Sequence, residues 1–291
     1  MTLKTWNGSK GNFKNPKDWT PKGIPAAGDD ADITNGTVRI RNLDLTDITL
    51  RVSSQSQSNP ATLDIRNSII GNLAIVPQTP QQFPVADMNI RGTVTEDGFV
   101  QLGDFSSVVA GSTLDIDIAN RHSTFINIGT INEGTGSTFD VTGKGAFEND
   151  GTLNVVGSNA TIDTPITGTG TINIEIGINT HEAQLTLGNS VSAGETVNVL
   201  GTALLLSDAP EFLGQINLAS PPPPFGLEEV TLQGVASTSA SYDGSTLSVF
   251  NGPNLVASLR IATPDHLTVT SSGGNTFITP GAPAALALPV S

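Results

Sequence analysis

Three aspartates that close a recurring phrase are the residues of this sequence whose type and spacing best suit chemistry. Asp115, Asp140 and Asp163 each follow a small residue, a Thr and an apolar residue. If these phrases stack on successive parallel strands, the carboxylates stand about 5 Å apart and repel one another. A hard divalent cation with oxygen ligands relieves such repulsion. The spacing therefore makes Asp115, Asp140 and Asp163 candidate calcium ligands, with solvated surface aspartates as the plainer interpretation, and it suggests no other cofactor.

Carboxylates also serve polysaccharide-cleaving enzymes, so the alternative function is a polysaccharide-binding or polysaccharide-degrading protein, that is, a hydrolase, a lyase or a tail-spike-like module. Glycoside hydrolysis needs two carboxylates facing one site, whereas these aspartates follow the repeat. Residues 52–291 hold only five basic side chains to neutralise an acidic sugar in a lyase. The sequence has no Gly-x-Ser-x-Gly elbow and no phosphate-binding glycine loop. His122, His181 and His266 lie too far apart in sequence for a metal-ligand motif. We expect no catalytic site.

The composition excludes several classes of protein. The 291 residues carry a formal net charge of −14, which disfavours binding to nucleic acid or to an anionic membrane surface. The absence of Cys excludes disulfides and thiolate chemistry. No run approaches the ~20 apolar residues of a membrane span. The charge is uneven, because residues 1–51 hold eight of the 13 basic side chains.

A repeat of about 20 residues organises the chain. A Gly-x-apolar element recurs, and its glycines are Gly71, Gly92, Gly129, Gly151 and Gly170. Apolar residues near these elements alternate with polar ones, which predicts strands rather than helices. We expect no helix of ten residues. Asn132, Asn154 and Asn173 share one phase of the repeat and are expected to stack into an amide ladder, although Asn is also common in tight turns.

These features predict an all-β fold, a single-stranded parallel β-helix (β-solenoid) ~40 Å long over its repeats. An antiparallel sandwich is the competing fold. The expected regions are an N-terminal cap (1–35), the parallel β-helix (36–220), a C-terminal antiparallel β cap (225–280) and a tail or linker (281–291). Four prolines at 221–224 mark the boundary before the C-terminal cap. Short strands are expected there at 229–235, 245–250, 255–261, 266–270 and 275–279.

The first 33 residues carry a family resemblance. They resemble the "W-x-G…NW-x-P-x-x-P-x-x-G-D-x-A-x-I" opening of large bacterial β-helical surface proteins of the autotransporter-passenger and adhesin type. The matching residues are Trp6-Asn7-Gly8, Asn12-Phe13, Asn15, Trp19, Pro21, Gly23-Ile24-Pro25, Gly28-Asp29, Ala31 and Ile33. In that family the segment looks like the cap at the start of the helix. The residues themselves agree, because Trp6, Phe13 and Trp19 suit a hydrophobic seal. A sugar-stacking platform is the alternative for these rings, and a calcium site is the alternative for the neighbouring aspartates.

The resemblance implies an extracellular bacterial protein of the cell surface or biofilm matrix. We expect a secreted, non-catalytic structural or adhesive protein whose leader is absent from this chain. Its expected partners are itself, through assembly into oligomers or filaments, or surface glycans that bind exposed rows of Thr, Ser and Asn. We expect neither nucleic-acid binding nor membrane insertion.

Overall fold

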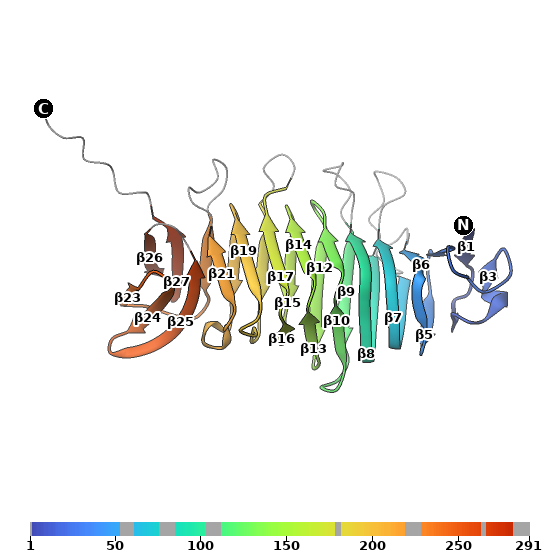
Figure 1. The fold of residues 1–291 in the computed structure, drawn as a ribbon, viewed down its shortest axis with the longest axis horizontal. Coiled ribbons are helices and arrows are strands. Elements are labelled where there is room, and N and C mark those ends of the chain that lie inside the picture. The colour runs from blue at the N-terminus through green and yellow to red at the C-terminus, as the bar shows by residue number, and fades with distance from the viewer. Residues whose placement is uncertain are drawn as a thin grey trace, which may run out of the picture.

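The fold is all-β, and its strands form one large sheet in which most pairings are parallel. The structure, a computed structural model, describes residues 2–52, 61–75, 85–102, 112–177, 182–218, 228–262 and 266–281. Figure 1 shows the strands side by side along an elongated body, with β1 near one end and β26 and β27 at the other. Most of the expected tail, residues 282–291, and the prolines at 221–224 lie outside the described residues.

The parallel strands fall into three stacks, within which each strand pairs with the one before and the one after. In the first stack the order is β2 (Lys10–Asn12), β5 (Thr37–Arg41), the starts of β7 (Ala61–Ile75) and β8 (Val85–Leu102), β9 (Thr113–Ile118), β12 (Thr138–Gly143), β15 (Asn159–Ile162), β18 (Gln184–Leu187), β20 (Ala203–Leu206) and β22 (Glu229–Leu232). The second stack contains the start of β6 (Asp44–Val52), the middles of β7 and β8, then β10 (Thr124–Asn127), β13 (Ala146–Asn149) and β16 (Ile166–Gly168).

The third stack runs the length of the molecule. Its order is β1 (Leu3–Trp6), β4 (Asp30–Ile33), the ends of β6, β7 and β8, β11 (Thr130–Glu133), β14 (Thr152–Val156), β17 (Thr171–Glu175), β19 (Thr196–Leu200), β21 (Gln215–Leu218) and β25 (Asn254–Ala262). Through the middle of the chain, one strand of each stack follows another in a fixed order, as β12, β13 and β14 do. The predicted alternation is confirmed, because inward residues such as Ile131, Leu153 and Ile172 align in buried rows.

Antiparallel pairing is concentrated near the two ends of the described chain. At the start, β1 pairs with β3 (Trp19–Thr20), which follows the 3-10 turn η1 (Pro16–Asp18). Near the C-terminus, β23 (Ser239–Tyr242) and β24 (Thr246–Asn251) join β25, while β26 (Leu267–Ser272) and β27 (Asn275–Pro280) pair with each other and β27 with β22. Strands thus occur in every C-terminal segment where the sequence predicts one. Because the other pairings are parallel, an antiparallel sandwich does not describe this fold.

The aromatic residues near the N-terminus are buried, so the sugar-stacking alternative for them is wrong. Trp6, Phe13 and Trp19 are at most 1% exposed. The Trp19 ring meets Trp6 and Phe13 edge to face at centroid distances of 5.2 Å each, and its Nε1 donates to the Phe13 carbonyl at 2.9 Å. Such pairs add stability beyond the burial of their area. These rings seal the core beside β1 and β4.

Short polar connections replace helices in this fold. The described helical elements are the 3-10 turns η1 and η3 (Ala209–Glu211), of three residues each. Within the described ranges, no helix has the length and apolar character needed to cross a bilayer.

A column of glycines explains the recurring Gly-x-apolar element. Gly71, Gly98, Gly129 and Gly151 precede the third stack at equivalent positions, and a Cβ on each of the last three would collide with the carbonyl oxygen of the previous glycine. Gly92 belongs elsewhere, since it follows the first stack with a φ of 74° and lies against the Asn67 side chain. Gly98 occupies the equivalent position in this coil, so the prediction that placed the repeating element at Gly92 was wrong.

Replacing Gly129 with Ala should destabilise the protein strongly, because the new methyl group has no space beside the Gly98 carbonyl. Overpacking of this kind costs about 3 kcal/mol of unfolding free energy. Urea denaturation followed by circular dichroism measures the change. The control is Gly136→Ala, where a Cβ meets open space and only the positive φ of 75° is strained, at a cost of about 1 kcal/mol. Equal losses in the two variants would contradict the close approach at Gly129.

Candidate functional site

An asparagine ladder runs along the outer side of the third stack. Asn132, Asn154 and Asn173 pair in register, as the sequence predicts, and Asn198 and Asn217 extend the row. From Asn154 onward, each Nδ2 donates to the Oδ1 of the preceding Asn, at 2.7 Å for the bonds of Asn173, Asn198 and Asn217. All five side chains are partly exposed. The ladder stabilises the stacking and presents an even, repeating surface.

An aspartate column lies on the outer side of the first stack, but its members differ from those predicted. Asp115 pairs with Asp140, as expected, and on its other side with Asp87. Asp140 then pairs with Thr161, because the phrase that ends in Asp163 is displaced by two residues. Asp163 follows the end of β15 and lies outside the row. Thus Asp87, Asp115 and Asp140 form the column, and the pairing does not align Asp163 with the other two.

The electrostatics of this column agree with carboxylates in close proximity. Partial burial raises the pKa of Asp115, and the negative charges of Asp140 and Asp87 raise it further. Burial also raises the pKa of Asp87. Among the described residues, no three His, Cys, Asp or Glu side chains are grouped closely enough to hold a metal ion. Calcium binding by Asp115, Asp140 and Asp163 stays a prediction of the sequence.

Asp29, one of the N-terminal aspartates, has a local structural role. Asp29 accepts hydrogen bonds from the backbone N–H groups of Thr2 and Ala26 at 2.9 and 3.0 Å, which lower its pKa. It therefore closes a turn, as the plainer interpretation predicts. His122 and His266 are exposed, and His181 lies outside the described residues.

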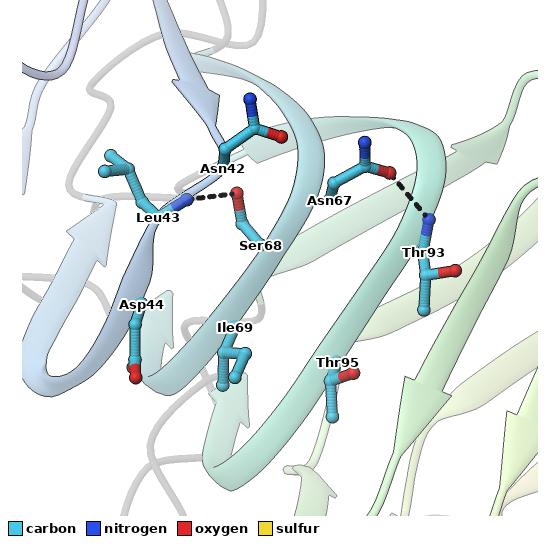
Figure 2. Close-up of a pocket in the computed structure, with 8 residues that line it drawn as sticks. All are labelled: Asn42, Leu43, Asp44, Asn67, Ser68, Ile69, Thr93 and Thr95. Atoms are coloured by element: carbon cyan, nitrogen blue, oxygen red, sulfur yellow. Dashed lines mark hydrogen bonds between the residues drawn. The ribbon is translucent and has the colours of Figure 1, made fainter.

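An open groove of about 610 Å³ is a further candidate site, and the sequence analysis did not predict it. It lies where β5, β7 and β8 leave the first stack and enter the second. Figure 2 shows the eight residues that line it: Asn42, Leu43, Asp44, Asn67, Ser68, Ile69, Thr93 and Thr95. Two hydrogen bonds order its wall, from Leu43 N to Ser68 Oγ and from Thr93 N to Asn67 Oδ1, both at 3.2 Å. Asn42 and Asn67 hold left-handed turns, with φ of 49° and 45°.

The groove suits hydrogen bonding better than catalysis. Within the described part of the chain, the side chains of Asn42, Thr93 and Thr95 have no hydrogen-bond partner, so they are available to a ligand. Leu43 and Ile69 are partly exposed and add apolar surface. Asp44 is the one carboxylate of the lining, and its bonds from the Thr46 side chain and backbone lower its pKa. A single ionised carboxylate lacks the partner that glycoside hydrolysis requires.

Buried carboxyl groups form a second feature that sequence analysis missed. Glu96 pairs in register with Asn127, and Asn127 with Asn149. Asn127 Nδ2 donates to Asn149 Oδ1 at 2.7 Å, and Asn149 Nδ2 donates to Glu195 Oε2 at 3.0 Å. All four side chains are fully buried. This interior row therefore has a carboxyl group near each end.

Burial controls the charge of these glutamates. It raises the pKa of Glu96 to about 7, with Asp97 adding to the effect and a hydrogen bond from the Gly98 backbone opposing it. It likewise raises the pKa of Glu195 to about 7, against the hydrogen bond from Asn149. Glu133 is fully buried, and its pKa lies well above the usual value. Because Glu96 and Glu195 are fully buried, these groups affect stability rather than suggest a reaction.

Comparisons with models of protein families and with curated proteins found no match to this chain. The interpretation of the site therefore depends on its geometry and on the N-terminal resemblance.

Stability should fall as the pH rises from about 4.5 to about 7. Glu96 and Glu195 have raised pKa values in the folded state, so that state binds more protons than the unfolded chain within this interval. Glu133 acts in the same direction, because burial raises its pKa well above the usual value. Asp29, Asp44 and Asp243 have lowered pKa values and act below pH 3.8, outside the interval.

Urea denaturation at pH 5 and pH 8 measures this difference. The double variant Glu96→Gln with Glu195→Gln keeps an acceptor oxygen at both sites but cannot ionise there. It should reduce the pH dependence and unfold at higher urea than the parent protein at pH 8. Glu182→Gln, at an exposed carboxylate, is the control. An unchanged pH dependence in the double variant would show that other groups cause it.

Proposed function

We propose that this chain is a single-stranded parallel β-helix that serves as a non-catalytic structural or adhesive protein outside a bacterial cell. The three stacks support this fold, since one strand of each stack follows in a fixed order along the chain. In this proposal residues 1–35 cap the helix, 36–220 form it, 225–280 close it with antiparallel strands, and 281–291 are a tail. The N-terminal resemblance supports a location at the cell surface or in a biofilm matrix.

The observation that carries the proposed function is the unbroken ladder from Asn132 to Asn217. Its amides repeat at equal intervals on one outer row. A regular surface of this kind fits lateral contact with a polymer or with another copy of the chain, because the same hydrogen-bonding group recurs at each strand. A polysaccharide-degrading enzyme instead needs two carboxylates around one cleft. The groove in Figure 2 has only Asp44.

The first candidate partner is another copy of this chain. Stacked parallel strands expose unpaired backbone groups at the last strand of a stack unless another segment covers them. At the C-terminal end, β27 covers β22 by antiparallel pairing, and β24 covers one side of β25. End-to-end contact therefore requires displacement of these strands, whereas side-by-side contact through the asparagine ladder does not. We propose lateral assembly into oligomers or filaments, or lateral adhesion to glycans.

Light scattering after size-exclusion chromatography, with negative-stain microscopy, tests this function. A protein-concentration series with and without calcium should show elongated particles that either associate side by side or stay monomeric rods. Association would identify a self-assembling matrix component, and rods would favour adhesion. A reducing-sugar assay on a panel of polysaccharides should detect no cleavage. Compact round particles would contradict the β-helix, and cleavage of any polysaccharide would contradict the non-catalytic function.

A further inference from the structure

Three arginines form a ladder at the end of the first stack. Arg41 pairs in register with Arg66, and Arg66 pairs with Arg91. Each follows a buried isoleucine and precedes a residue in a left-handed turn. All three arginines are exposed. Neighbouring strands are about 4.8 Å apart, so the fold aligns three positive charges at short, regular intervals on its surface.

Within the described residues, most of this charge has no ion-pair partner. Arg41 Nη2 lies 3.7 Å from Asp64 Oδ2, and Arg39 Nε lies 3.9 Å from the same oxygen. No carboxylate of the described residues lies within ion-pair distance of Arg66 or Arg91. Residues 1–91 contain ten of the 13 basic side chains but only eight of the 27 acidic ones. The ladder is thus a local positive site in a protein of net charge −14.

The ladder adjoins the groove. Asn42 and Asn67 directly follow Arg41 and Arg66, and Thr93 lies two residues after Arg91. Figure 2 shows these three groove residues at one end of the lining, with Asp44 and Thr95 at the other. Among the described residues, the ion pairs do not include one between Asp44 and these arginines. Together the two features offer cationic groups beside uncommitted amide and hydroxyl groups and the apolar surface of Leu43 and Ile69.

We propose that the arginine ladder and this groove bind an acidic polysaccharide whose sugars carry carboxylate or sulfate groups. This inference deepens the proposed adhesive function and rests on it. Guanidinium groups bind carboxylates and sulfates through paired hydrogen bonds. The groove supplies partners for sugar hydroxyls. A polymer with an anionic group on each repeating unit meets successive arginines, and the linked contacts reinforce one another.

A nucleic acid fits these residues less well. Single-stranded nucleic acid is held by aromatic side chains on which the bases stack, and the lining of the groove has none. A polysaccharide with its own hydroxyl groups matches the amide and hydroxyl lining more closely.

Biolayer interferometry on immobilised polymers tests the proposal with the full chain. The probes are polygalacturonate, dextran sulfate, neutral dextran and single-stranded DNA. We expect binding to one or both acidic polysaccharides, weakened by added salt, with none to neutral dextran and weaker binding to DNA. The carboxylate and sulfate arms distinguish the two sources of negative charge.

The double variant Arg66→Gln with Arg91→Gln should lower this affinity about tenfold or more, since it removes charge-assisted hydrogen bonds at both sites. Arg66→Lys with Arg91→Lys should retain an intermediate affinity. Arg121→Gln removes one positive charge from an exposed turn outside the groove and should bind as the parent protein does. Circular dichroism and the thermal midpoint establish that each variant is folded.

Three results would overturn the proposal: no binding to either acidic polysaccharide, unchanged binding by the folded Gln variant, or equal binding to DNA. None of these bears on particle shape or on the absence of polysaccharide cleavage. Failure of the ligand proposal is therefore distinguishable from failure of the proposed function.

Discussion

Parallel register between neighbouring strands is the constraint on which the rest of this structure depends. Strands about 4.8 Å apart place each residue beside its equivalent on the next strand, so any property of one position is repeated along a row. Apolar rows then make a continuous core, and the asparagine row satisfies its amides from Asn132 to Asn217. The same closeness excludes a side chain at Gly129, where only a hydrogen atom fits against the carbonyl of Gly98.

Register also aligns like charges, which is unfavourable unless something relieves it. The charged rows of this protein differ in this respect. In the aspartate column, burial and neighbouring carboxylates raise the pKa of Asp115. In the interior row, Asn127 and Asn149 lie between the two carboxyl groups, and burial raises the pKa of Glu96 and Glu195 to about 7. In the arginine ladder, Asp64 neutralises only the end at Arg41. Charge that stays exposed and unpaired in this way is available to a ligand. For this reason the arginine ladder, of the three charged rows, is the best candidate for a binding site.

Sequence analysis correctly predicts features that recur with a recognisable pattern of residue types. It fails where such a pattern occurs out of register with the strand pairing. Alternating residues and the Asn phase correctly indicate strands and the row through Asn132, Asn154 and Asn173. The phrase ending in Asp163 has the same pattern of residue types as the one ending in Asp140 but is displaced by two residues, which only the pairing of Thr161 reveals. Gly92 was misassigned because left-handed turns also select glycine. The arginine ladder had a visible signal, Ile-Arg followed by Asn or Gly, whereas the burial of Glu96 and Glu195 needs the third dimension.

Disulfide trapping between β14 and β17 tests the central claim, parallel register, most directly. The chain has no native Cys to interfere. Thr152 and Thr171 are paired and partly exposed, so their Cα atoms lie within the range that a disulfide spans. The variant with Cys at both positions should form an intramolecular disulfide on mild oxidation, and a variant with Cys at 152 and 175 should not. Antiparallel pairing would bring residues 152 and 175 together instead, so the reverse result would contradict the account.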